Sequence, residues 1–472
     1  MSAAKRPRSS NLSWVHPLES GAGPRYMQIA RQIAGAVEGG VLRPGDRLPP
    51  QRELAQLLKV DLTTVTRAYS EIRLLGLLDA QGSGGSYITS RISTVEPADG
   101  AIDVSMNAPP LLAGPLPVRL QRAASTHVAY RASEDVLMSY QVGAGTKADR
   151  DAGALWLKPM LGRVDGQQII VCPGAQSALA ALLLTQTREG DTVVAEPLTY
   201  PGFLAAARLF RRNVAPVVSD AQGMRPDALE AACIKHRPGL IYLTPTIKNP
   251  TATTMTEQRR RDIYAIATRY GVGIVEDDPY WLLAGDAPPP IATLMGRSRG
   301  SPVFYISTLS KCLSPGLRTA YLVMPPSRPI APVLDALRCM VLMPAGWMTA
   351  MATQWIQSGG ALKLLGAIRE ELAARQHLAA SILPEAAVGH PYGLHRWLPL
   401  PSSWDQFRLV QFAREQGLDV TASYAFAVSE TVPNAVRISL GGAVERVVLD
   451  AGLRRLAAMW SDSAPQRSFN VM

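Results

Sequence analysis

From about residue 102 onward, the sequence alternates short, nearly continuous apolar runs with longer stretches of helical periodicity. Examples are QQIIVCPG followed by SALAALLLTQT, and GLIYLTP followed by EQRRRDIYAIATRYG. A strand that is apolar throughout is buried on both faces, and parallel strands need crossover connections that are usually helices. The pattern therefore predicts an α/β fold with a mainly parallel sheet between helices. The final segment, 364–472, mixes helix with short strands, which is typical of a smaller α+β subdomain.

The first ninety residues follow a different pattern. Ile29, Ile33 and Val37 recur at helical spacing and the run stops at two glycines. Two further helices follow, and the runs LLDAQ and SYITS then read as a β-hairpin joined by a Gly-Ser-Gly-Gly turn. The helical stretches are 26–39, 50–58 and 62–75. Helix, short helix, helix and hairpin in this order predict a winged helix-turn-helix.

Domain boundaries are expected where the pattern changes. Residues 91–103 (RISTVEPADGAID) are polar and carry no apolar period, so they predict a short linker. The winged helix-turn-helix then spans 22–90 and the α/β body 104–465. A length of 472 residues agrees with more than one domain, because a domain typically takes about 100–200 residues.

The charge is unevenly distributed. The whole chain carries 48 Lys and Arg against 38 Asp and Glu, a net charge of +10. Residues 1–92 hold 12 basic and 7 acidic residues, so half of the excess lies on one fifth of the chain. A basic terminal unit indicates a polyanion partner, although a solubilising surface would give the same count.

Composition also excludes several classes of protein. No apolar stretch approaches the roughly 20 residues of a membrane span. The basic start MSAAKRPRSS is not followed by an apolar segment, so no secretory signal is readable and we expect a cytoplasmic protein. The four cysteines are widely spaced and form no CxxC pair, which predicts neither a disulfide framework nor a metal site.

The third helix of the head carries the side chains expected to read DNA. In a helix-turn-helix, early residues of the second motif helix reach base edges in the major groove. Thr63, Thr64 and Arg67 occupy that end of the helix, and Arg52 on the preceding helix is placed to reach a phosphate or a guanine. Gly84, at the hairpin tip, would let the wing approach the minor groove. The same pattern alone also fits an ordinary packing module.

The run GDRLPPQRELAQLLKVDLTTVTRAYSEIRLLGLL, with the later GSGGSYI, resembles the DNA-binding domain of the GntR family of bacterial repressors over about sixty residues. The resemblance implies DNA contacts by Arg52 and Thr64, and a contribution to specificity from Thr63, Thr66 and Arg67. The chain departs from the family at Pro50, where Ser is usual, and at Leu62, where many members have Arg.

In the body, one lysine lies close in sequence to two hydroxyl residues and an arginine. Lys311 follows two hydroxyls, Thr308 and Ser310, and precedes Arg318 by seven residues. An arginine fork with short donors suits a phosphate monoester, beside an amine that can form a Schiff base. A lysine in a loop is more often a solvated surface residue. Upstream, the Ala175-Gln176 turn between a strand and a helix offers a second anion cradle.

A second group of polar residues lies in Glu-Asp-Asp-Pro-Tyr (276–280), at the end of an apolar strand. A buried Asp paired to a pyridinium nitrogen makes the ring an electron sink, and a phenol three residues on can bond the ring's 3-oxygen. Asp277 and Tyr280 have this spacing. The amide of Asn249 can reach the same oxygen. Carboxylates at a strand end are otherwise turn formers or caps, and Asn-Pro is otherwise a turn signal.

Together these motifs resemble the fold type I aminotransferases, which bind pyridoxal 5′-phosphate (PLP), over residues 102–460. They stand in the family's order: PGAQ, EPxxYPG, TPxxxNPT, EDDPY, SxxSKxxxPGLR and VRISLG. The resemblance implies that Lys311 is the aldimine lysine, that Asp277 holds the pyridine nitrogen, that Tyr280 and Asn249 hold the 3-oxygen, and that Tyr200 stacks on the ring. It further implies a phosphate site of Thr308, Ser310, Arg318, Ala175 and Gln176, and a fork from Arg437 onto a ligand carboxylate. Tyr140 would reach the phosphate of a neighbouring subunit, or is a core tyrosine.

A GntR-like head joined to an aminotransferase-like body resembles the MocR subfamily of bacterial transcription regulators. The resemblance implies a homodimer that binds a double-stranded operator and senses PLP or an amino-acid-like effector through an aldimine. A different interpretation stays open: an active aminotransferase of 2-aminoadipate or aromatic type with an accessory DNA-binding domain. A DNA-binding protein that uses the body only as a dimerisation scaffold is the third.

Overall fold

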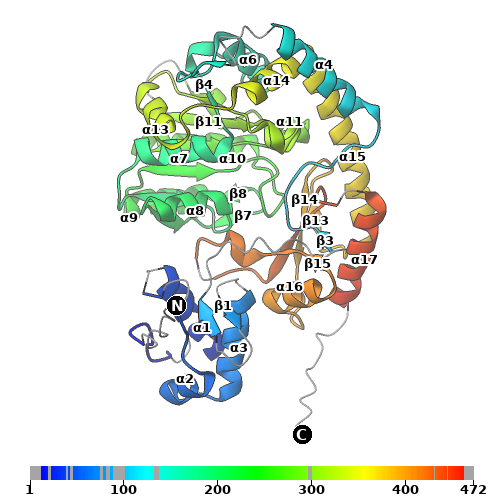
Figure 1. Cartoon of the computed structure of the whole chain (residues 1–472). Coiled ribbons are helices and arrows are strands. Elements are labelled where there is room, and N and C mark those ends of the chain that lie inside the picture. Colours follow the sequence, from blue (N-terminus) through cyan, green and yellow to red (C-terminus); the bar gives the residue numbers. More distant parts are fainter. Residues whose placement is uncertain are drawn as a thin grey trace, which may run out of the picture. The chain divides into compact units, whose positions relative to one another are not determined.

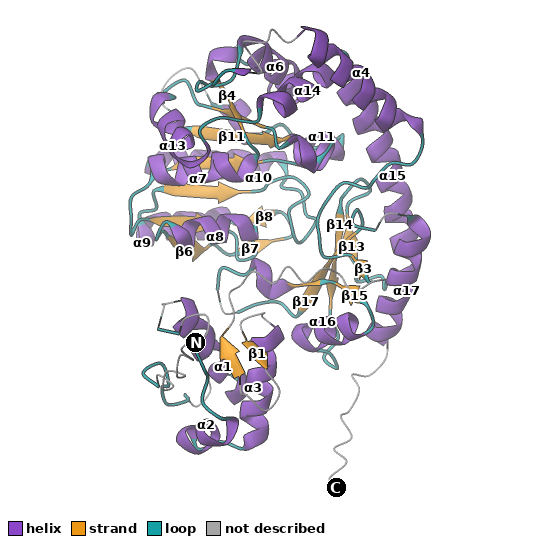
Figure 2. Cartoon of the chain, viewed as in Figure 1, coloured by secondary structure: helices purple, strands orange, loops and turns teal. Residues whose placement is uncertain are grey.

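The computed structural model describes residues 12–19, 23–38, 41–42, 46–74, 78–80, 86–88, 101–131, 138–295, 300–429, 431–443 and 445–461. The chain divides into two compact units, Met1–Gly100 and Ala101–Met472. Figure 1 shows the path of the chain and Figure 2 its helices and strands. Within the described ranges, every helix is too short or too polar to cross a bilayer.

The first unit is a winged helix-turn-helix. Its helices are α1 (Arg25–Glu38), α2 (Gln51–Leu58) and α3 (Leu62–Leu74), and its hairpin pairs β1 (Leu78–Ala80) with β2 (Ser86–Ile88) antiparallel. Val65, Tyr69 and Ile72 of α3 are buried against Ile29 and Ile33 of α1, as the helical spacing predicts. A shared core of this kind fixes the crossing of α1 and α3 and so leaves the opposite side of α3 to solvent.

The second unit is built on a seven-stranded sheet. In spatial order the strands are β4 (Ile169–Cys172), β12 (Ala320–Val323), β11 (Val303–Thr308), β10 (Gly273–Asp277), β9 (Leu240–Leu243), β5 (Thr192–Ala195) and β6 (Asn213–Pro216). Strand β12 runs antiparallel to both of its neighbours, and the other pairings are parallel. The predicted mainly parallel sheet is confirmed.

Helices cover both faces of this sheet (Figure 2). Alternate residues of one strand enter different cores: Ile170 and Cys172 pack with one set of helices, and Ile169 and Val171 with the other. The first set is α7 (Ala175–Gln186), α8 (Pro201–Leu209) and α13 (Ala331–Val341). The second is α4 (Pro115–Arg131), α6 (Lys147–Leu161), α9 (Pro226–His236), α10 (Glu257–Tyr270), α14 (Gly346–Gln357) and α15 (Gly360–Ile382). Burial on both faces explains why these strands are apolar throughout.

The C-terminal part forms a smaller α+β layer. Its antiparallel sheet has the order β13 (Val388–Gly389), β14 (His395–Pro399), β17 (Ala435–Ser439) and β16 (Thr421–Ala422), with α16 (Gln406–Glu415) and α17 (Arg446–Ser461) beside it. Strand β3 (Ile102–Asp103) pairs in parallel with β15 (Leu418–Asp419). The last two residues of the expected linker are therefore a strand of the second unit.

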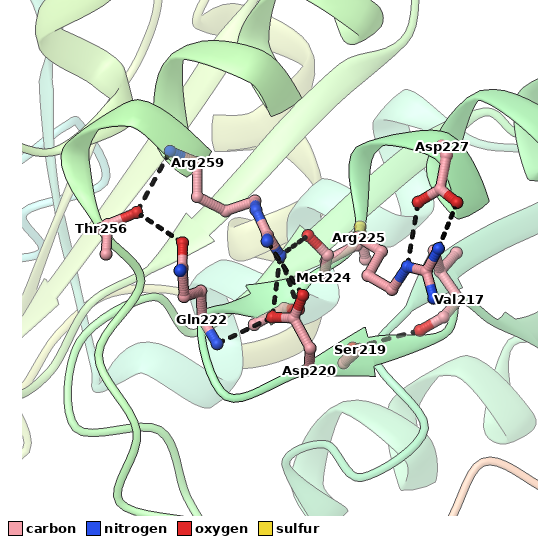
Figure 3. Close-up of polar contacts among 10 residues, drawn as sticks. Val217, Ser219, Asp220, Gln222, Met224, Arg225, Asp227, Thr256 and Arg259 are labelled. Carbon is pink, nitrogen blue, oxygen red and sulfur yellow. Dashed lines mark hydrogen bonds and ion pairs between the residues drawn. The ribbon is translucent and has the colours of Figure 1, made fainter.

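A short hairpin of β7 (Ser219–Asp220) and β8 (Gly223–Met224) is tied to the first turn of α10 (Figure 3). The guanidinium of Arg259 meets both carboxylate oxygens of Asp220 at 3.0 Å and also bonds the carbonyls of Gly223 and Met224. Gly223 has φ +96°, and a Cβ there would lie 3.5 Å from Glu196 Oε1. Gly223 of the hairpin therefore lies beside the buried side chains of Met255 and Glu196.

Candidate cofactor site and nucleic-acid interface

Three of the expected site residues of the second unit lie on segments at the carboxyl ends of the central strands. Asp277 is the last residue of β10 and pairs in register with Ile306 of β11. Two residues later, β11 passes into the one-turn helix α12 (Leu309–Cys312), which carries Lys311. The segment holding Asn249 follows β9, the other neighbour of β10. In open α/β sheets, ligands bind outside this edge, so the fold assembles three separate motifs there.

Asp277 is buried, and only one of its two carboxylate oxygens has a hydrogen-bond partner among the described residues. Its Oδ2 accepts a hydrogen bond of 2.8 Å from the Tyr242 hydroxyl, while Oδ1 has no hydrogen-bond partner among the residues that the structure describes. Burial raises the pKa of Asp277 to about 6, and the Tyr242 hydrogen bond and the charge of Lys311 oppose that rise. A buried carboxylate oxygen without a partner is costly unless a ligand donor meets it. A protonated ring nitrogen is such a donor.

The Lys311 amine is poised for nucleophilic chemistry. Its Nζ donates a hydrogen bond to the backbone carbonyl of Asn107. Burial, together with the charges of Arg437 and Arg318, lowers its pKa to about 8, and the charge of Asp277 acts in the opposite direction. A neutral amine is the form that attacks a carbonyl carbon, and the lowered pKa makes this form more abundant near neutral pH than for an ordinary lysine.

An anion cradle lies at the start of α7. Gly174 caps this helix with φ +94° and no side-chain bond to its first amides. A Cβ on Gly174 would stand 2.5 Å from Nη2 of Arg318, so only glycine lets that guanidinium approach. The Thr308 hydroxyl accepts from the Ser310 amide at 3.2 Å, and the buried Ser310 Oγ has no partner within the described part of the chain. Free helix amides, an Arg and a spare hydroxyl together suit a phosphate.

The other residues expected at the phosphate and the ring lie beside this cradle, with one exception. Ala175 is the first residue of α7, and Gln176 Nε2 donates to the Gly202 carbonyl at 2.8 Å. Tyr200 caps α8, and burial together with the nearby Asp277 charge raises the pKa of its phenol. Tyr140 is 76% exposed, so the alternative of a core tyrosine is wrong within this chain.

Arg437, on β17, faces the same space. Its Nη1 donates to Asn249 Oδ1 at 3.0 Å, and its Nη2 donates to the Ser105 carbonyl and to Thr421 Oγ1. Burial lowers its pKa to about 10, which leaves it charged at neutral pH. Because Asn249 uses its oxygen on Arg437, its amide hydrogens remain for a ligand acceptor. A buried, charged fork of this kind suits a carboxylate.

Sequence reasoning missed several residues of the site. Asn107 Nδ2 lies 2.9 Å from Tyr280 Oη and 3.4 Å from His395 Nδ1, and all three side chains are buried. Tyr242, the partner of Asp277, lies inside an apolar run. Tyr242 and His395 could have been noticed as polar side chains within largely apolar segments. Nothing in the segment DVSMNAPP distinguishes Asn107 in the same way.

In the first unit, most of the expected DNA-reading residues of α2 and α3 are at the surface. Arg52 and Thr63 are exposed and Thr64 is half-buried. Thr66 donates to Gln51 Oε1 at 2.7 Å, which ties α3 to the start of α2. Gly84 lies outside the described residues.

Arg67 is engaged within the head. Its guanidinium carbon lies 3.7 Å from the centre of the Tyr26 ring, and Nη2 donates to the Tyr26 hydroxyl at 2.9 Å. A cavity of about 350 Å³ lies at the start of α2 and is lined by Arg47, Arg52 and Leu62 among others. Pro50 caps α2 without a side-chain hydrogen bond, so the first amides of α2 are left for another acceptor, such as a DNA phosphate.

Comparison with known proteins agrees with both units. Residues 100–456 match the family model of aminotransferase class I and II, and residues 25–88 match that of bacterial regulatory proteins, gntR family. The HTH-type transcriptional regulator YdeF of Bacillus subtilis is 28% identical over 460 residues, which are 96% of this chain and 97% of that protein. YdcR of Escherichia coli, with the same description, is 25% identical and covers 86% of this chain and 92% of its own length.

Solved structures resemble the second unit. A kynurenine aminotransferase from Pyrococcus horikoshii superposes with a TM-score of 0.69 at 25% identity, covering 78% of this chain and 92% of its own. LysN, an α-aminoadipate aminotransferase from Thermus thermophilus, gives 0.67 at 25% identity, with 77% and 92% covered. The chain belongs to the aminotransferase class I and II family and carries a head of the gntR family of bacterial regulatory proteins, the combination that defines the MocR subfamily of regulators.

Proposed function

We propose that this protein is a PLP-dependent, DNA-binding transcription regulator whose second unit senses PLP or an amino-acid-like compound. The observation that carries the proposal is the union, in one chain, of a gntR-type head with a body that keeps a reactive amine, a buried carboxylate and an anion cradle. The similarity to proteins described as HTH-type transcriptional regulators over nearly the whole chain supports it.

The residues present fit PLP, the cofactor on which the aminotransferase class I and II family generally depends. The unpartnered Oδ1 of Asp277 would accept from the ring nitrogen, and the Lys311 amine would bond the aldehyde carbon. Bound PLP supplies an electron-withdrawing ring and that aldehyde. Thr308, Ser310, Arg318 and the Ala175-Gln176 turn would hold the phosphate.

The remaining residues of the site would orient the cofactor and its ligand. Tyr280 and Asn249 would donate to the 3-oxygen of the ring, and Tyr200 would stack on its face. Arg437 would bind the carboxylate of an amino compound in exchange for its bond to the Ser105 carbonyl, and its bond to Asn249 would keep that amide oriented.

For the head, we propose that Arg52, Thr63, Thr64, Thr66 and Gly84 contact double-stranded DNA. Arg67, held on Tyr26, would act chiefly by fixing α3 against α1. We further propose boundaries of 22–90 for the head and an end near 465 for the body, whose start moves from the expected 104 to the strand Ile102–Asp103. We also propose a homodimer in which the exposed Tyr140 reaches the phosphate of the partner. A ligand can change DNA affinity only by binding two arrangements of the protein unequally, so sensing requires such a pair.

A quantitative footprint on the DNA beside the protein's own gene, with and without PLP, tests the proposal. Binding by the full chain should change with PLP, and Lys311→Ala should remove that change without removing binding. Arg52→Ala and Thr64→Ala should each weaken DNA binding by about 1–3 kcal/mol. A protein that leaves no footprint at low salt, in either state, would show that the regulator assignment is wrong.

An amino-acid aminotransferase is the second candidate, supported by the buried, charged fork of Arg437 beside the amine of Lys311. An aromatic-amino-acid aminotransferase from Thermococcus litoralis is 26% identical over 337 residues. Transfer of an amino group from 2-aminoadipate or an aromatic amino acid to 2-oxoglutarate is the assay. Fast turnover by a protein that binds no DNA would favour this candidate.

A further inference from the structure

A row of buried hydrogen bonds leads from a backbone carbonyl to the phenol of Tyr280. His395 Nε2 lies 3.2 Å from the carbonyl oxygen of Lys248, and His395 Nδ1 lies 3.4 Å from Asn107 Nδ2. The same Asn107 nitrogen lies 2.9 Å from the Tyr280 hydroxyl. The first residue of the row is itself anchored, because the Lys248 ammonium pairs with Glu196 at 2.9 Å and both side chains are buried.

The carbonyl at the start of this row decides where the hydrogens lie. A backbone carbonyl only accepts, so His395 must carry its hydrogen on Nε2. Burial lowers the pKa of His395 to about 3, and the two cations that face it, Arg437 and Lys311, oppose its protonation. The ring is therefore neutral and has a single N–H. Nδ1 is then an acceptor, and Asn107 must turn its amide nitrogen, not its oxygen, toward the ring.

The orientation of Asn107 in turn fixes Tyr280. Since the amide nitrogen of Asn107 donates to the Tyr280 oxygen, the phenol accepts in that hydrogen bond and does not donate its own hydrogen. The hydrogen stays available for a different acceptor. Asn107 also accepts from the Lys311 amine through its backbone carbonyl, so one residue contacts both the phenol and the amine of the site.

We propose that Lys248, His395 and Asn107 form a positioning relay that holds the Tyr280 hydroxyl as a donor to the 3-oxygen of the bound cofactor. The proposal rests on the proposed function for the cofactor, but the relay itself exists independently of it. Asn107 and His395 are positioning residues, since they act through Tyr280. A donor at the 3-oxygen stabilises the negative form of that oxygen and lowers the pH at which the bound cofactor titrates.

The relay is tested first without any cofactor. In the full-length protein labelled with ¹⁵N-histidine, the imidazole signal removed by His395→Gln should show a protonated Nε2 and a bare Nδ1 from pH 5 to 8. The opposite tautomer, or a charged ring, would overturn the proposal, because Asn107 would then have to present its oxygen. This arm gives a result even if the protein binds no PLP, so failure of the relay and failure of the cofactor assignment are distinguishable.

The second arm measures the pH midpoint of the visible absorption band of the PLP-loaded protein. Asn107→Ala should raise the midpoint by about half a pH unit to one unit, the equivalent of one neutral hydrogen bond. In a Tyr280→Phe background, the same substitution should cause no further shift. The control is Asn213→Ala, which removes an exposed amide that bonds the Gly190 carbonyl and should leave the midpoint unchanged.

Two results of the second arm would contradict the relay. An unchanged midpoint in Asn107→Ala would show that Tyr280 keeps its orientation without the amide. An equal shift in the wild-type and Tyr280→Phe backgrounds would show that Asn107 acts by packing alone. If Asn107→Ala does not fold, His395→Leu takes its place, because loss of the Nδ1 acceptor frees the amide and should raise the midpoint in the same direction.

Discussion

Replacing Gly174 by alanine should detach the proposed phosphate cradle from its arginine. The added Cβ would stand 2.5 Å from Nη2 and 3.1 Å from Cζ of Arg318, so the guanidinium must move away. A hydrogen bond between charged groups contributes about 1.5–3 kcal/mol. Its loss corresponds to a rise of about tenfold to 150-fold in the dissociation constant for PLP.

Backbone strain has to be separated from this effect. Gly174 has φ +94° and ψ 163°, a backbone region that is almost restricted to glycine, and an alanine there costs about 1–3 kcal/mol of folding free energy. Gly114 provides the control, because its φ is +93° and nothing lies within 4 Å of its Cβ position. Both alanine variants should therefore lose similar stability in urea unfolding.

The assay is a titration of the cofactor-free protein with PLP, followed by visible absorbance, for the wild type and the two variants. Only Gly174→Ala should lose affinity. If both variants bound PLP as the wild type does, Arg318 would not hold the phosphate from its position beside Gly174. If both lost affinity equally, the effect would be strain and not the displaced guanidinium.

Three other predictions follow from charges and contacts. The rate of PLP uptake should rise about tenfold per pH unit below pH 8 and level off above it, because the pKa of Lys311 is lowered to about 8 and the neutral amine reacts; stopped-flow absorbance measures this. Burial raises the pKa of Asp278 to about 8, above its unfolded value, so its protonated form favours folding and that stability is lost as pH rises toward 8. Asp278→Asn should therefore flatten the pH dependence of urea unfolding between pH 5 and 8, and an unchanged slope would contradict this. Arg67→Ala should lower the stability of the head by about 0.5–1 kcal/mol, since it removes the contact with Tyr26; thermal unfolding of the full chain reports it.

Motifs that are local in sequence were the part of the site that sequence could predict. Lys311 with its hydroxyls, and Asp277 with Tyr280, lie within a few residues of one another, and the carboxyl edge of a parallel sheet is where such loops meet. The mainly parallel sheet and the winged helix-turn-helix follow from apolar periodicity in the same way. The residue types of the Lys311 and Asp277 motifs are also distinctive, because an unpaired amine or carboxylate is costly to bury unless a ligand pairs with it.

Contacts between residues that are far apart in sequence could not be predicted from local motifs. Asn107 is 173 residues from Tyr280 and 288 from His395, so only the fold brings the three together. Strand β3 lay beyond prediction for the same reason, because Ile102 and Asp103 look like linker until β15 supplies the partner more than three hundred residues later. Arg67 was expected at a DNA base, and no local pattern indicates that Tyr26 of another helix holds it.

The short segment from Ile102 to Asn107 both begins the second unit and contacts two residues of the proposed ligand site, which bears on signalling. Its carbonyls at Ser105 and Asn107 accept hydrogen bonds from Arg437 and Lys311, the side chains proposed to bind a ligand carboxylate and the cofactor aldehyde. A carboxylate bound at Nη2 of Arg437 would replace the Ser105 carbonyl there. Ser105 lies five residues along the chain from Gly100, the last residue of the first unit, so a ligand that displaced the Ser105 carbonyl would act on the backbone close to the point where the two units join in sequence.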